Sequence, residues 1–418
     1  MPTTMKRQSL LLLFLLLAGM ARSQAPTVDG DTITISMLTC EPHDEVYSLY
    51  GHTALRFRST SGKMDWAANY GVFDYATPNF VMRFALGRTD YILGVFPFED
   101  FKREYDSYGS AMHEQVLNLT KGEKERIYEA MYHNALPENR EYRYNYFYDN
   151  CTTRARNLVL ANIDGHIDWH RDMSAHEESY RDIVHRYNAA NPWSRFGCDL
   201  LLGIGADRAI SAEEAQFLPD NLQNDLNAAE VVAPDGSRRA LVSRTSVIRP
   251  HNPPMKGGSF PLRPRTCALL VLIASIAVTL WQWRKGNRWA WPFDAFLMLL
   301  SGLPGLVLTF MVLSEHPTVR VNLQWLILNP LPLFVGWHAL CRQRKYQRHW
   351  LWPTWTTLLL LGSIGAIAQQ YAEGVLVLAT AMLIRTLWHT QQQRDWQPKS
   401  QSLSEKKKTK HGKKVTDK

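Results

Sequence analysis

The sequence predicts an α+β domain followed by an α-helical transmembrane bundle. Within the first 248 residues, alternating apolar patterns typical of strands occur beside apolar stripes at helical spacing. After residue 265, by contrast, almost no charged side chain lies inside several long apolar segments. Residues 249–265 lie between the two parts and are rich in Pro, Gly and basic side chains, which is typical of a linker.

Residues 1–25 have the pattern of a secretory signal peptide. Two basic residues at positions 6 and 7 precede an apolar stretch at 10–17, and the ARS sequence at 21–23 provides a small-residue cleavage site. We therefore expect residues 26–248 to be exported. Retention of the segment as a short uncleaved anchor is the alternative, because anchored signals overlap this pattern.

The exported domain is long enough to form one substantial core. Apolar residues at every second position predict strands at 32–38, 53–58, 64–70 and 141–148. Apolar residues at helical spacing predict helices at 121–135, 152–162 and 175–187. Strands and helices mixed in this order predict the α+β class.

Cys151 directly follows an aromatic run and begins a predicted helix. Asp149 or Asn150 can act as the N-cap, so the sulfur would lie among the backbone N–H groups of the first turn. The positive end of the helix dipole, with Arg154 and Arg156 one turn on, favours the thiolate. Cys151 is therefore a candidate nucleophile, and a small core residue at a helix start is the alternative.

His52 stands at the entrance of the second predicted strand, in the run LYGHTALRFRS. A turn and a returning strand follow, so the cross-strand neighbour of His52 should be near Asn69 or Tyr70. A nucleophilic thiol needs a proton partner, and that partner needs an orienting group. His52 and Asn69 are our catalytic candidates for these roles, and a core histidine is the alternative.

We expect further side chains to contact substrate. Tyr148 belongs to an alternation of tyrosines at 142–148 that reads as one face of a half-buried strand or as a lipid groove. His316 lies in the loop at 314–322, where it could hold a lipid headgroup or a substrate amine or simply be a solvated cap. The apolar run at 80–98 is the best candidate for an acyl-chain channel, with a core segment as the alternative. The candidate substrate-binding residues are Tyr70, Tyr148, Arg154 and His316.

The membrane domain, residues 266–390, should cross the membrane about five times. The apolar segments are each near the roughly 20 residues that the hydrocarbon core requires, although the last two are short. They lie at 267–283, 293–313, 323–340, 353–369 and 373–388.

Basic side chains gather in the loops at 284–288 and 342–348, whereas the alternate loops hold one or none. Because basic loops remain cytoplasmic, the exported domain and the loop at 314–322 should lie in the periplasm, on the other side of the inner membrane. The tail at 391–418 is also basic: from Arg394 onward, nine Lys/Arg oppose three Asp/Glu, which accounts for +6 of the net charge of +8. The charge therefore indicates topology and a disordered cytoplasmic tail, not nucleic-acid binding.

Three cysteines, Cys40, Cys151 and Cys198, lie in the exported domain. In an oxidising compartment an odd number leaves one thiol unpaired or paired between chains. A disulfide between Cys40 and Cys198 would leave Cys151 free, although all three could be reduced. The sequence has neither HExxH nor CxxC, so we expect no metal and no cofactor.

Several ordered blocks of the chain resemble the Lnb-type lipoprotein N-acyltransferases. That resemblance implies a permuted papain-like, NlpC/P60-related exported domain in which the histidine precedes the cysteine, and it maps His52 and Cys151 onto the catalytic pair. It does not specify the third residue, so Asn69 rests on the strand pattern. The blocks are LTCEPHDEVYSLYGHTALRF (38–57), ANYGVFDY (68–75), GRTDYILG (87–94), YRYNYFYDNCTTRARN (142–157), FLPDNL (217–222) and, in the membrane half, HPTVRVNLQWLILNPL (316–331).

The resemblance implies ping-pong acyl transfer. Cys151 would attack an ester of a phospholipid, His52 would protonate the departing lysophospholipid, and the thioester would pass its acyl group to the N-terminal amine of a diacylated lipoprotein. The backbone N–H groups of Cys151 and Thr152 are the expected oxyanion donors. The expected partners are the phospholipid donor, the lipoprotein acceptor and the membrane.

The cost of moving an acyl chain explains a membrane domain. Taking about 15 methylenes into water at roughly 0.8 kcal/mol each costs about 12 kcal/mol, which an enzyme held at the bilayer surface avoids. Two alternatives remain. A membrane-anchored cysteine peptidase or amidase acting on envelope peptides would use the same pair but needs only one anchor, and a non-catalytic binding module would contain a structural Cys151.

Overall fold

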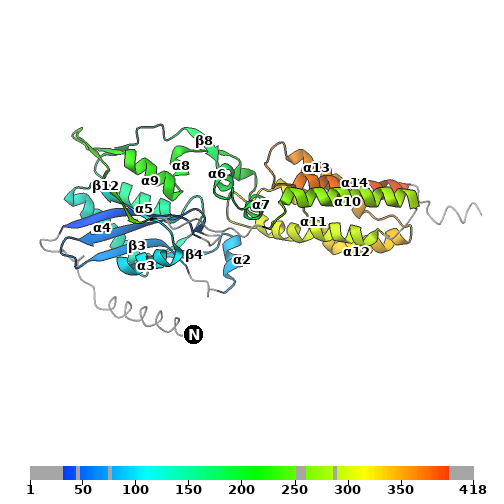
Figure 1. Ribbon diagram of the computed structural model, residues 1–418, viewed down its shortest axis with the longest axis horizontal. Coiled ribbons are helices and arrows are strands. Elements are labelled where there is room, and N and C mark those ends of the chain that lie inside the picture. The colour runs from blue at the N-terminus through cyan, green and yellow to red at the C-terminus, as the bar shows by residue number, and fades with distance from the viewer. Residues whose placement is uncertain (1–31, 44–47, 74–77, 251–259, 286–289, 395–418) are drawn as a thin grey trace, which may run out of the picture. The chain divides into compact units, whose positions relative to one another are not determined.

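The computed structural model describes residues 32–43, 48–73, 78–250, 260–285 and 290–394. They belong to two compact units that alternate along the chain (Figure 1). The predicted signal peptide, the middle of the predicted linker and the tail after Arg394 lie outside the described residues. The first unit comprises Met1–Asp74, Asp90–Ser174 and Glu213–Pro254, and the second comprises Tyr75–Thr89, Ala175–Ala212 and Met255–Lys418. This division differs from the contiguous domains expected from the sequence.

The first unit is built on an antiparallel sheet of seven strands in the order β12-β5-β1-β2-β3-β4-β6. A smaller sheet has the order β11-β10-β7. The strands are β1 Ile33–Cys40, β2 His52–Ser59, β3 Asp65–Val72, β4 Asp90–Pro97, β5 Met112–Leu117, β6 Glu141–Arg143, β7 His166–Asp168, β10 Glu230–Val232, β11 Arg238–Ala240 and β12 Val242–Arg249.

Helices cover both faces of the large sheet, with α3 on the opposite side from α5 and α9 (Figure 1). Alternation along β2 explains the two layers, because Leu55 and Phe57 enter the core with α4, α5 and α9, whereas Ala54 packs with α3. The helices are α3 Phe98–Tyr108, α4 Lys121–Ala135, α5 Cys151–Leu160, α8 Ala212–Ala215 and α9 Pro219–Ala228.

The structure confirms the α+β class, the first three predicted strands and the helix at 121–135. The predicted strand at 141–148 is wrong after Arg143, because Asn145 and Asp149 exchange backbone hydrogen bonds of 2.9 Å and close a tight turn. The predicted helix at 175–187 begins instead with a strand, His176–Ser179, and Ser179 caps the helix that follows.

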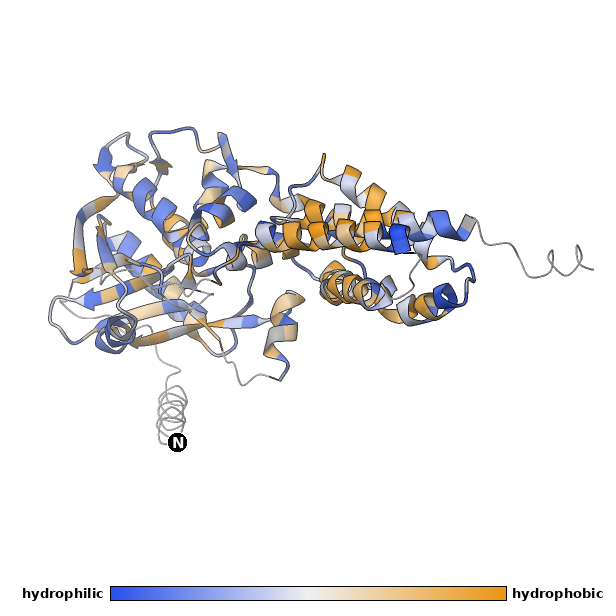
Figure 2. Cartoon of the chain, turned by 45° about the vertical axis from the view of Figure 1, so that its right-hand side comes forward, coloured by the Kyte–Doolittle hydropathy of each residue, from blue (hydrophilic) through white to orange (hydrophobic). Residues whose placement is uncertain are grey.

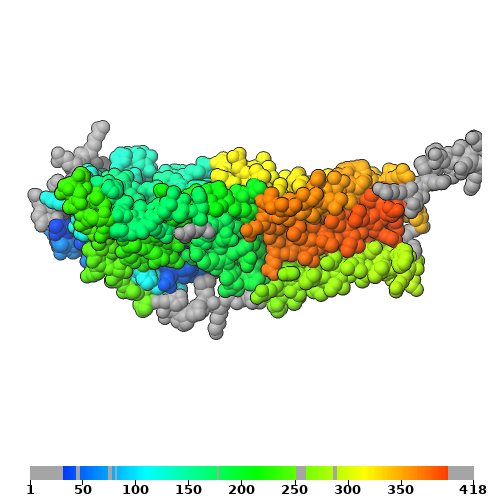
Figure 3. All heavy atoms as spheres, turned by 90° about the horizontal axis from the view of Figure 1, so that it is seen from above, coloured from blue at the N-terminus to red at the C-terminus, as the bar shows by residue number. Residues whose placement is uncertain are grey.

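The second unit contains the C-terminal helices, whose residues are mostly apolar (Figure 2). Helix α10 lies along α14, and α14 packs on α13 (Figure 3). The elements are α2 Phe80–Ala85, β8 His176–Ser179, α6 Tyr180–Tyr187, α7 Pro192–Leu201, η2 Ile204–Ala206, β9 Ala209–Ser211, α10 Pro264–Lys285, α11 Trp291–Val312, η3 Leu323–Leu326, α12 Leu331–Arg344, α13 Leu351–Gly365 and α14 Val375–Arg394.

Two of these helices, α10 and α11, are long and apolar enough to cross a membrane, judged over the described residues. The other predicted spans correspond to α12, α13 and α14. The segment predicted as one span at 323–340 is divided, because η3 ends before Asn329 and Pro330 and α12 begins after them. With 14 residues, α12 is about 21 Å long at 1.5 Å per residue.

Charged residues inside the helical bundle are paired. Arg385 donates from Nε to Asp294 Oδ1 at 2.9 Å, and His389 Nε2 lies 3.0 Å from Asp294 Oδ2. All three side chains are about 1 % exposed. An unpaired charge in such surroundings would be strongly destabilising, so the cluster joins α11 to α14.

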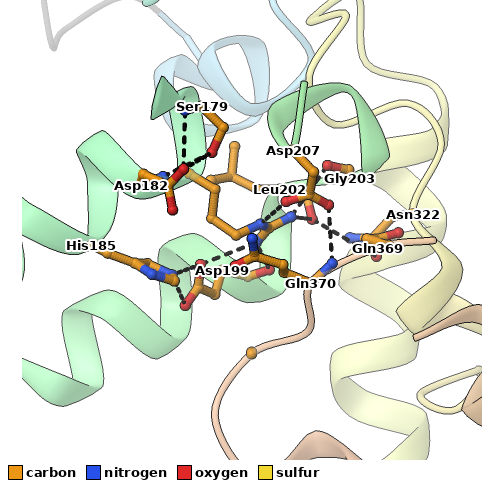
Figure 4. A network of polar contacts seen from close by, with 12 residues as sticks. Ser179, Asp182, His185, Asp199, Leu202, Gly203, Asp207, Asn322, Gln369 and Gln370 are labelled. Atoms are coloured by element: carbon orange, nitrogen blue, oxygen red, sulfur yellow. Dashed lines mark hydrogen bonds and ion pairs between the residues drawn. The ribbon is translucent and has the colours of Figure 1, made fainter. Parts of the chain in front are cut away.

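A second buried network ties residues 175–212 to the loops of the helical bundle (Figure 4). Arg181 on α6 is fully buried, and its guanidinium donates to Asp199, to Asp207 and to the carbonyl oxygens of Leu202 and Gly203. Asp207 accepts the backbone N–H of Gln370, which precedes α14, at 3.1 Å. These contacts explain why α6 and α7 belong to the second unit although the sequence places them beside the first.

Candidate active site

The first residues of strand β2 and of helix α5 are joined to each other. Thr53 Oγ1 and Thr152 Oγ1 lie 3.1 Å apart, although 99 residues separate them in the chain. Both threonines are buried. His52 and Cys151 directly precede these threonines and line the same pocket. The imidazole and the thiol are close enough for each to shift the pKa of the other.

Asn150 is the N-cap of α5. Its Oδ1 accepts the backbone N–H groups of Thr152 at 3.0 Å and Thr153 at 2.9 Å. Its Nδ2 donates to the carbonyl oxygen of Phe217 at 2.9 Å. The cap therefore holds both the start of α5 and one wall of the site, and Cys151 is the first residue of the helix, as predicted.

Asn69 on β3 orients the histidine. Its Oδ1 lies 2.8 Å from His52 Nε2 and also accepts the backbone N–H of Gly71 at 2.8 Å. Because an amide oxygen can only accept, Nε2 carries the proton, and Nδ1 is left to face the thiol. The cross-strand prediction of Asn69 as the neighbour of His52 agrees with this geometry.

Aromatic rings from α3 stand beside the imidazole. Tyr105 is stacked at 6.4 Å between ring centroids with an interplanar angle of 14°, and the centroid of Phe101 is also 6.4 Å away. Gly71 lies close against the histidine, since a Cβ added there would be 2.6 Å from His52 Cε1. The imidazole is therefore confined by neighbours and cannot easily rotate.

The thiol and imidazole shift each other's pKa. Burial raises the pKa of Cys151, but the charge and hydrogen bond of His52, the backbone N–H of Thr53 and the hydroxyl of Thr152 lower it to about 7. Burial lowers the pKa of His52, but the charge and hydrogen bond of Cys151 and the hydrogen bond of Asn69 raise it above its usual value. Both shifts favour a thiolate–imidazolium pair.

Replacing Asn69 should change the pH dependence of the thiol. We expect Asn69→Ala to reduce the rate of Cys151 alkylation by iodoacetamide and to lower the pKa of His52, because a hydrogen bond that raises that pKa is lost. Asn69→Asp should raise the His52 pKa by adding a negative charge. Alkylation rates measured from pH 5 to 10 check both directions, and equal shifts in the two variants would contradict this role.

A small pocket of about 60 Å³ opens at the thiol. Aromatic side chains form much of its wall, and none of the residues lining it is Asp, Glu, Lys or Arg. The volume accommodates a reacting carbonyl group but not a long acyl chain. Its lining residues are Tyr50, Gly51, His52, Gly71, Tyr144, Tyr146, Asn150, Cys151, Thr152, Phe217, Leu218 and Pro219.

The oxyanion donors differ in part from the expectation. The backbone N–H of Thr152 already donates to the Asn150 cap. The backbone N–H of Cys151 has no acceptor among the residues that the structure describes. Cys151 N–H is therefore the donor that remains available to a developing negative charge.

Three of the predicted substrate-binding residues, Tyr70, Tyr148 and Arg154, do not line this pocket. Tyr70 points to the opposite face of β3 from Asn69 and lies in the core, where its hydroxyl accepts from Asn134 at 3.1 Å. Arg154 forms two 2.6 Å hydrogen bonds with Asp149. Tyr148 is 41 % exposed and does not line the pocket. His316 lies in the second unit, 3.1 Å from the carbonyl oxygen of Phe84.

Cys40 lies opposite His52 in the pairing of β1 with β2. It is a buried free thiol, so the structure contains no disulfide from Cys40 to Cys198. Burial raises the pKa of Cys40 well above its usual value, although Tyr105 donates a hydrogen bond that opposes the shift. The Cys40 thiol therefore remains protonated near pH 7, a pH at which the Cys151 thiol begins to ionise. Among the described residues, no three His, Cys, Asp or Glu side chains are grouped to hold a metal.

Several residues of the site were not singled out from the sequence. Thr53 follows a predicted catalytic residue, Gly71 comes two positions after Asn69, and the hydroxyl of Thr152, unlike its backbone N–H, was not expected at the site. Their adjacency was an available signal, but the contacts between them depend on tertiary pairing. Tyr105 comes from a distant segment and carried no local signal, and Phe217 lies in a block of the family resemblance that did not assign it a role.

Comparison with known proteins gives two matches that cover most of the chain. Residues 22–190 match the family model described as the Lnb N-terminal periplasmic domain, and residues 256–395 match the one described as the Lnb transmembrane domain. No curated protein and no solved structure is significantly similar to the chain. The two matches indicate an inner-membrane protein with a periplasmic domain.

Proposed function

The chain belongs to the Lnb-type lipoprotein N-acyltransferase family, and on that premise we propose that it moves an acyl chain from a phospholipid to the N-terminal amine of a diacylglyceryl-cysteine lipoprotein. The intermediate is a thioester on Cys151. The observation that carries this proposal is the grouping of Cys151 and His52 in one pocket, with His52 hydrogen-bonded to Asn69. This is the composition and order of a cysteine nucleophile, its base and an orienting amide.

In the first half-reaction, the Cys151 thiolate attacks an ester carbonyl of the phospholipid. The negative charge that develops on the carbonyl oxygen is stabilised by the backbone N–H of Cys151. As the carbon–oxygen bond breaks, imidazolium His52 gives its Nδ1 proton to the leaving oxygen. Lysophospholipid departs, and the enzyme retains a thioester and a neutral histidine.

In the second half-reaction, the amine of the diacylated lipoprotein attacks the thioester. An α-amino group has a reference pKa of roughly 7.7–8.0, so a useful neutral fraction exists near pH 7. His52 takes a proton from the amine while the carbon–sulfur bond breaks. The products are an amide and the original thiolate–imidazolium pair, which restores the starting state.

Transfer of a deuterated acyl group from phospholipid tests the proposal. The full-length protein is placed in liposomes containing phosphatidylethanolamine with deuterated acyl chains, first alone and then with a synthetic diacylated lipopeptide. We expect a hydroxylamine-sensitive deuterated acyl group on Cys151, then lysophospholipid and a triacylated lipopeptide in equal amounts. An acceptor with an acetylated N-terminus should remain unmodified.

The same experiment distinguishes acyl transfer from the main alternative activity. A membrane-anchored cysteine peptidase or amidase would shorten the peptide and leave the phospholipid intact. Peptide cleavage without lysophospholipid would therefore overturn the acyl-transfer proposal while leaving Cys151 and His52 as catalytic residues.

The rate of thioester formation should depend on pH in a bell-shaped manner. Since the Cys151 pKa is lowered to about 7, about half of the thiol is ionised at pH 7, against about 3 % for an ordinary thiol of pKa about 8.5. The rate should rise as pH passes 7 and fall once pH exceeds the raised pKa of His52, because the imidazolium then loses its proton. Single-turnover rates from pH 5 to 10 would contradict this pair if they rose only above pH 8.5.

A further inference from the structure

Helix α2 is attached to the loop that follows α11. Ser314 Oγ donates to the carbonyl oxygen of Ala85 at 2.8 Å, and the backbone N–H of Glu315 donates to the carbonyl oxygen of Leu86 at 2.9 Å. Arg88 and Glu315 add an ion pair of 3.0 Å. Backbone as well as side-chain groups make this attachment, so α2 is a defined part of the second unit and not a loosely placed loop.

Glycine is required where the two segments meet. Gly87 has a φ of +70°, and a Cβ at this position would lie 3.2 Å from both Glu315 Cβ and the backbone nitrogen of His316. His316, predicted from the sequence to contact substrate, lies 3.1 Å from the carbonyl oxygen of Phe84. The loop at 314–316 therefore holds the C-terminal end of α2.

The position of this loop relative to the membrane also gives the position of α2 relative to the membrane. Helix α10 enters the membrane after the periplasmic domain and ends at Arg284 and Lys285, and α11 returns and ends at Val312. Because basic helix ends remain in the cytoplasm, the end of α11 lies at the periplasmic surface of the bilayer. The attached α2 therefore also lies at the periplasmic surface of the bilayer.

Helix α2 exposes two large apolar side chains. Met82 is 50 % exposed and Phe84 is 37 % exposed, and at the end of α11 Val312 and Leu313 are 45 % and 65 % exposed. Leu313 directly precedes the residues that bind α2. Exposed apolar side chains therefore occur both at the end of the transmembrane helix α11 and on the attached α2, and such side chains at the membrane surface are expected to contact lipid.

We infer that α2 is an interfacial membrane element, whose side chains Met82 and Phe84 insert among the phospholipids of the periplasmic leaflet. Arg83, which lies between them and is also exposed, suits the phosphate layer. The partner is the phospholipid bilayer itself. This contact does not depend on the reaction that the enzyme catalyses.

The chain connects this element to the catalytic strands. Asn69 and Gly71 lie on β3, α2 follows, and the chain returns as β4 in the same sheet. Because the pocket at Cys151 has no room for an acyl chain, the chain of the donor must extend out of the pocket. Contact of α2 with the bilayer helps to supply the donor phospholipid, and this second step rests on the proposed acyl transfer.

Photocrosslinking tests the membrane contact. Phe84 is replaced by p-benzoylphenylalanine in the full-length protein in liposomes, and the same replacement at Trp66 on β3 is the control, because Trp66 is 38 % exposed and Phe84 37 %. On irradiation, intact mass should rise by one phospholipid for position 84 and at least fivefold less often for position 66. Equal labelling of the two positions, or no lipid adduct at 84, overturns the inference.

A paired rate measurement tests the role in donor supply. Met82→Ser/Phe84→Ser should slow thioester formation from phospholipid in liposomes about tenfold or more, whereas acylation by soluble p-nitrophenyl butyrate should remain within twofold. Phe84→Leu should retain most of the lipid rate. Loss of both rates would overturn the donor role, since folding or the catalytic site would then be affected. If the unaltered enzyme is not acylated at Cys151 by either ester, the acyl-transfer proposal fails, whereas the crosslinking result still decides the membrane contact.

Discussion

Replacing Cys151 by alanine should abolish acyl transfer and leave the fold intact. We expect conversion of diacylated to triacylated lipoprotein to fall by at least about 1000-fold, because the nucleophile that would form the thioester is removed. Cys151→Ser should be nearly as inactive, since a serine hydroxyl near this imidazole does not ionise near pH 7 as the thiol does. Conversion is measured by the mass of the lipopeptide product in liposomes.

Matched substitutions make this result specific. Cys267→Ala and Cys341→Ala each remove a half-buried thiol from the helical bundle, and both should retain activity within about twofold. His52→Ala should lose activity to nearly the same extent as Cys151→Ala. The two residues act as one unit, so removing either one should lower the rate nearly as much as removing both. Conversion retained in Cys151→Ser would show that Cys151 is a structural cysteine and not the nucleophile.

The site could be predicted from the sequence where its signals are local. Asn150 followed by Cys151 and an apolar helical stripe indicates a capped helix, so the position of the sulfur depends on the first turn alone. The strand that begins at His52 and its return through Asn69 form a hairpin, whose register limits the neighbours of the histidine to a few residues. Both predictions agree with the described geometry.

Other features could not be predicted because they depend on distant contacts. The hydrogen bond between Thr53 and Thr152 joins residues 99 positions apart, and nothing in either segment indicates the other. The burial of Arg181 explains the alternation of the two units along the chain. In the sequence this residue is an ordinary charge on an amphipathic helix, and its carboxylate partners lie 18 and 26 residues away. The turn closed by Asn145 and Asp149 overrides the alternation of tyrosines that predicts a longer strand.

Two tyrosines reach the pocket because strand β6 ends at Arg143, earlier than the sequence predicts. In a continuing strand they would all point to one face, whereas the turn carries Tyr144 and Tyr146 to the pocket and leaves Tyr142 in the core. An aromatic wall of this kind limits access of water to the thiol. Restricted access of water favours transfer of the acyl group to an amine over hydrolysis of the thioester.

A single added methyl group at Gly71 should inactivate the enzyme almost as fully as loss of a catalytic side chain. Gly71 does not have a positive φ, so alanine can adopt its backbone conformation. The added Cβ would lie 2.6 Å from His52 Cε1 and 3.2 Å from Asn69 Oδ1, so the imidazole must move away from its orienting amide. Because a displacement of about 1 Å can cost about 100-fold in rate, we expect Gly71→Ala to reduce thioester formation by at least that factor.

Gly197→Ala is the matched control, since Gly197 lies within α7 and a Cβ there meets no atom within 4 Å. Alanine inside a helix should stabilise the protein by about 0.5–1 kcal/mol and leave the rate unchanged. The thermal midpoint of Gly71→Ala should remain within a few degrees of the unaltered protein, while the pKa of Cys151 measured by alkylation rises because its imidazolium partner is displaced. If Gly71→Ala kept both the rate and the low thiol pKa, the confined pairing of His52 with Cys151 could not be the arrangement that performs the reaction.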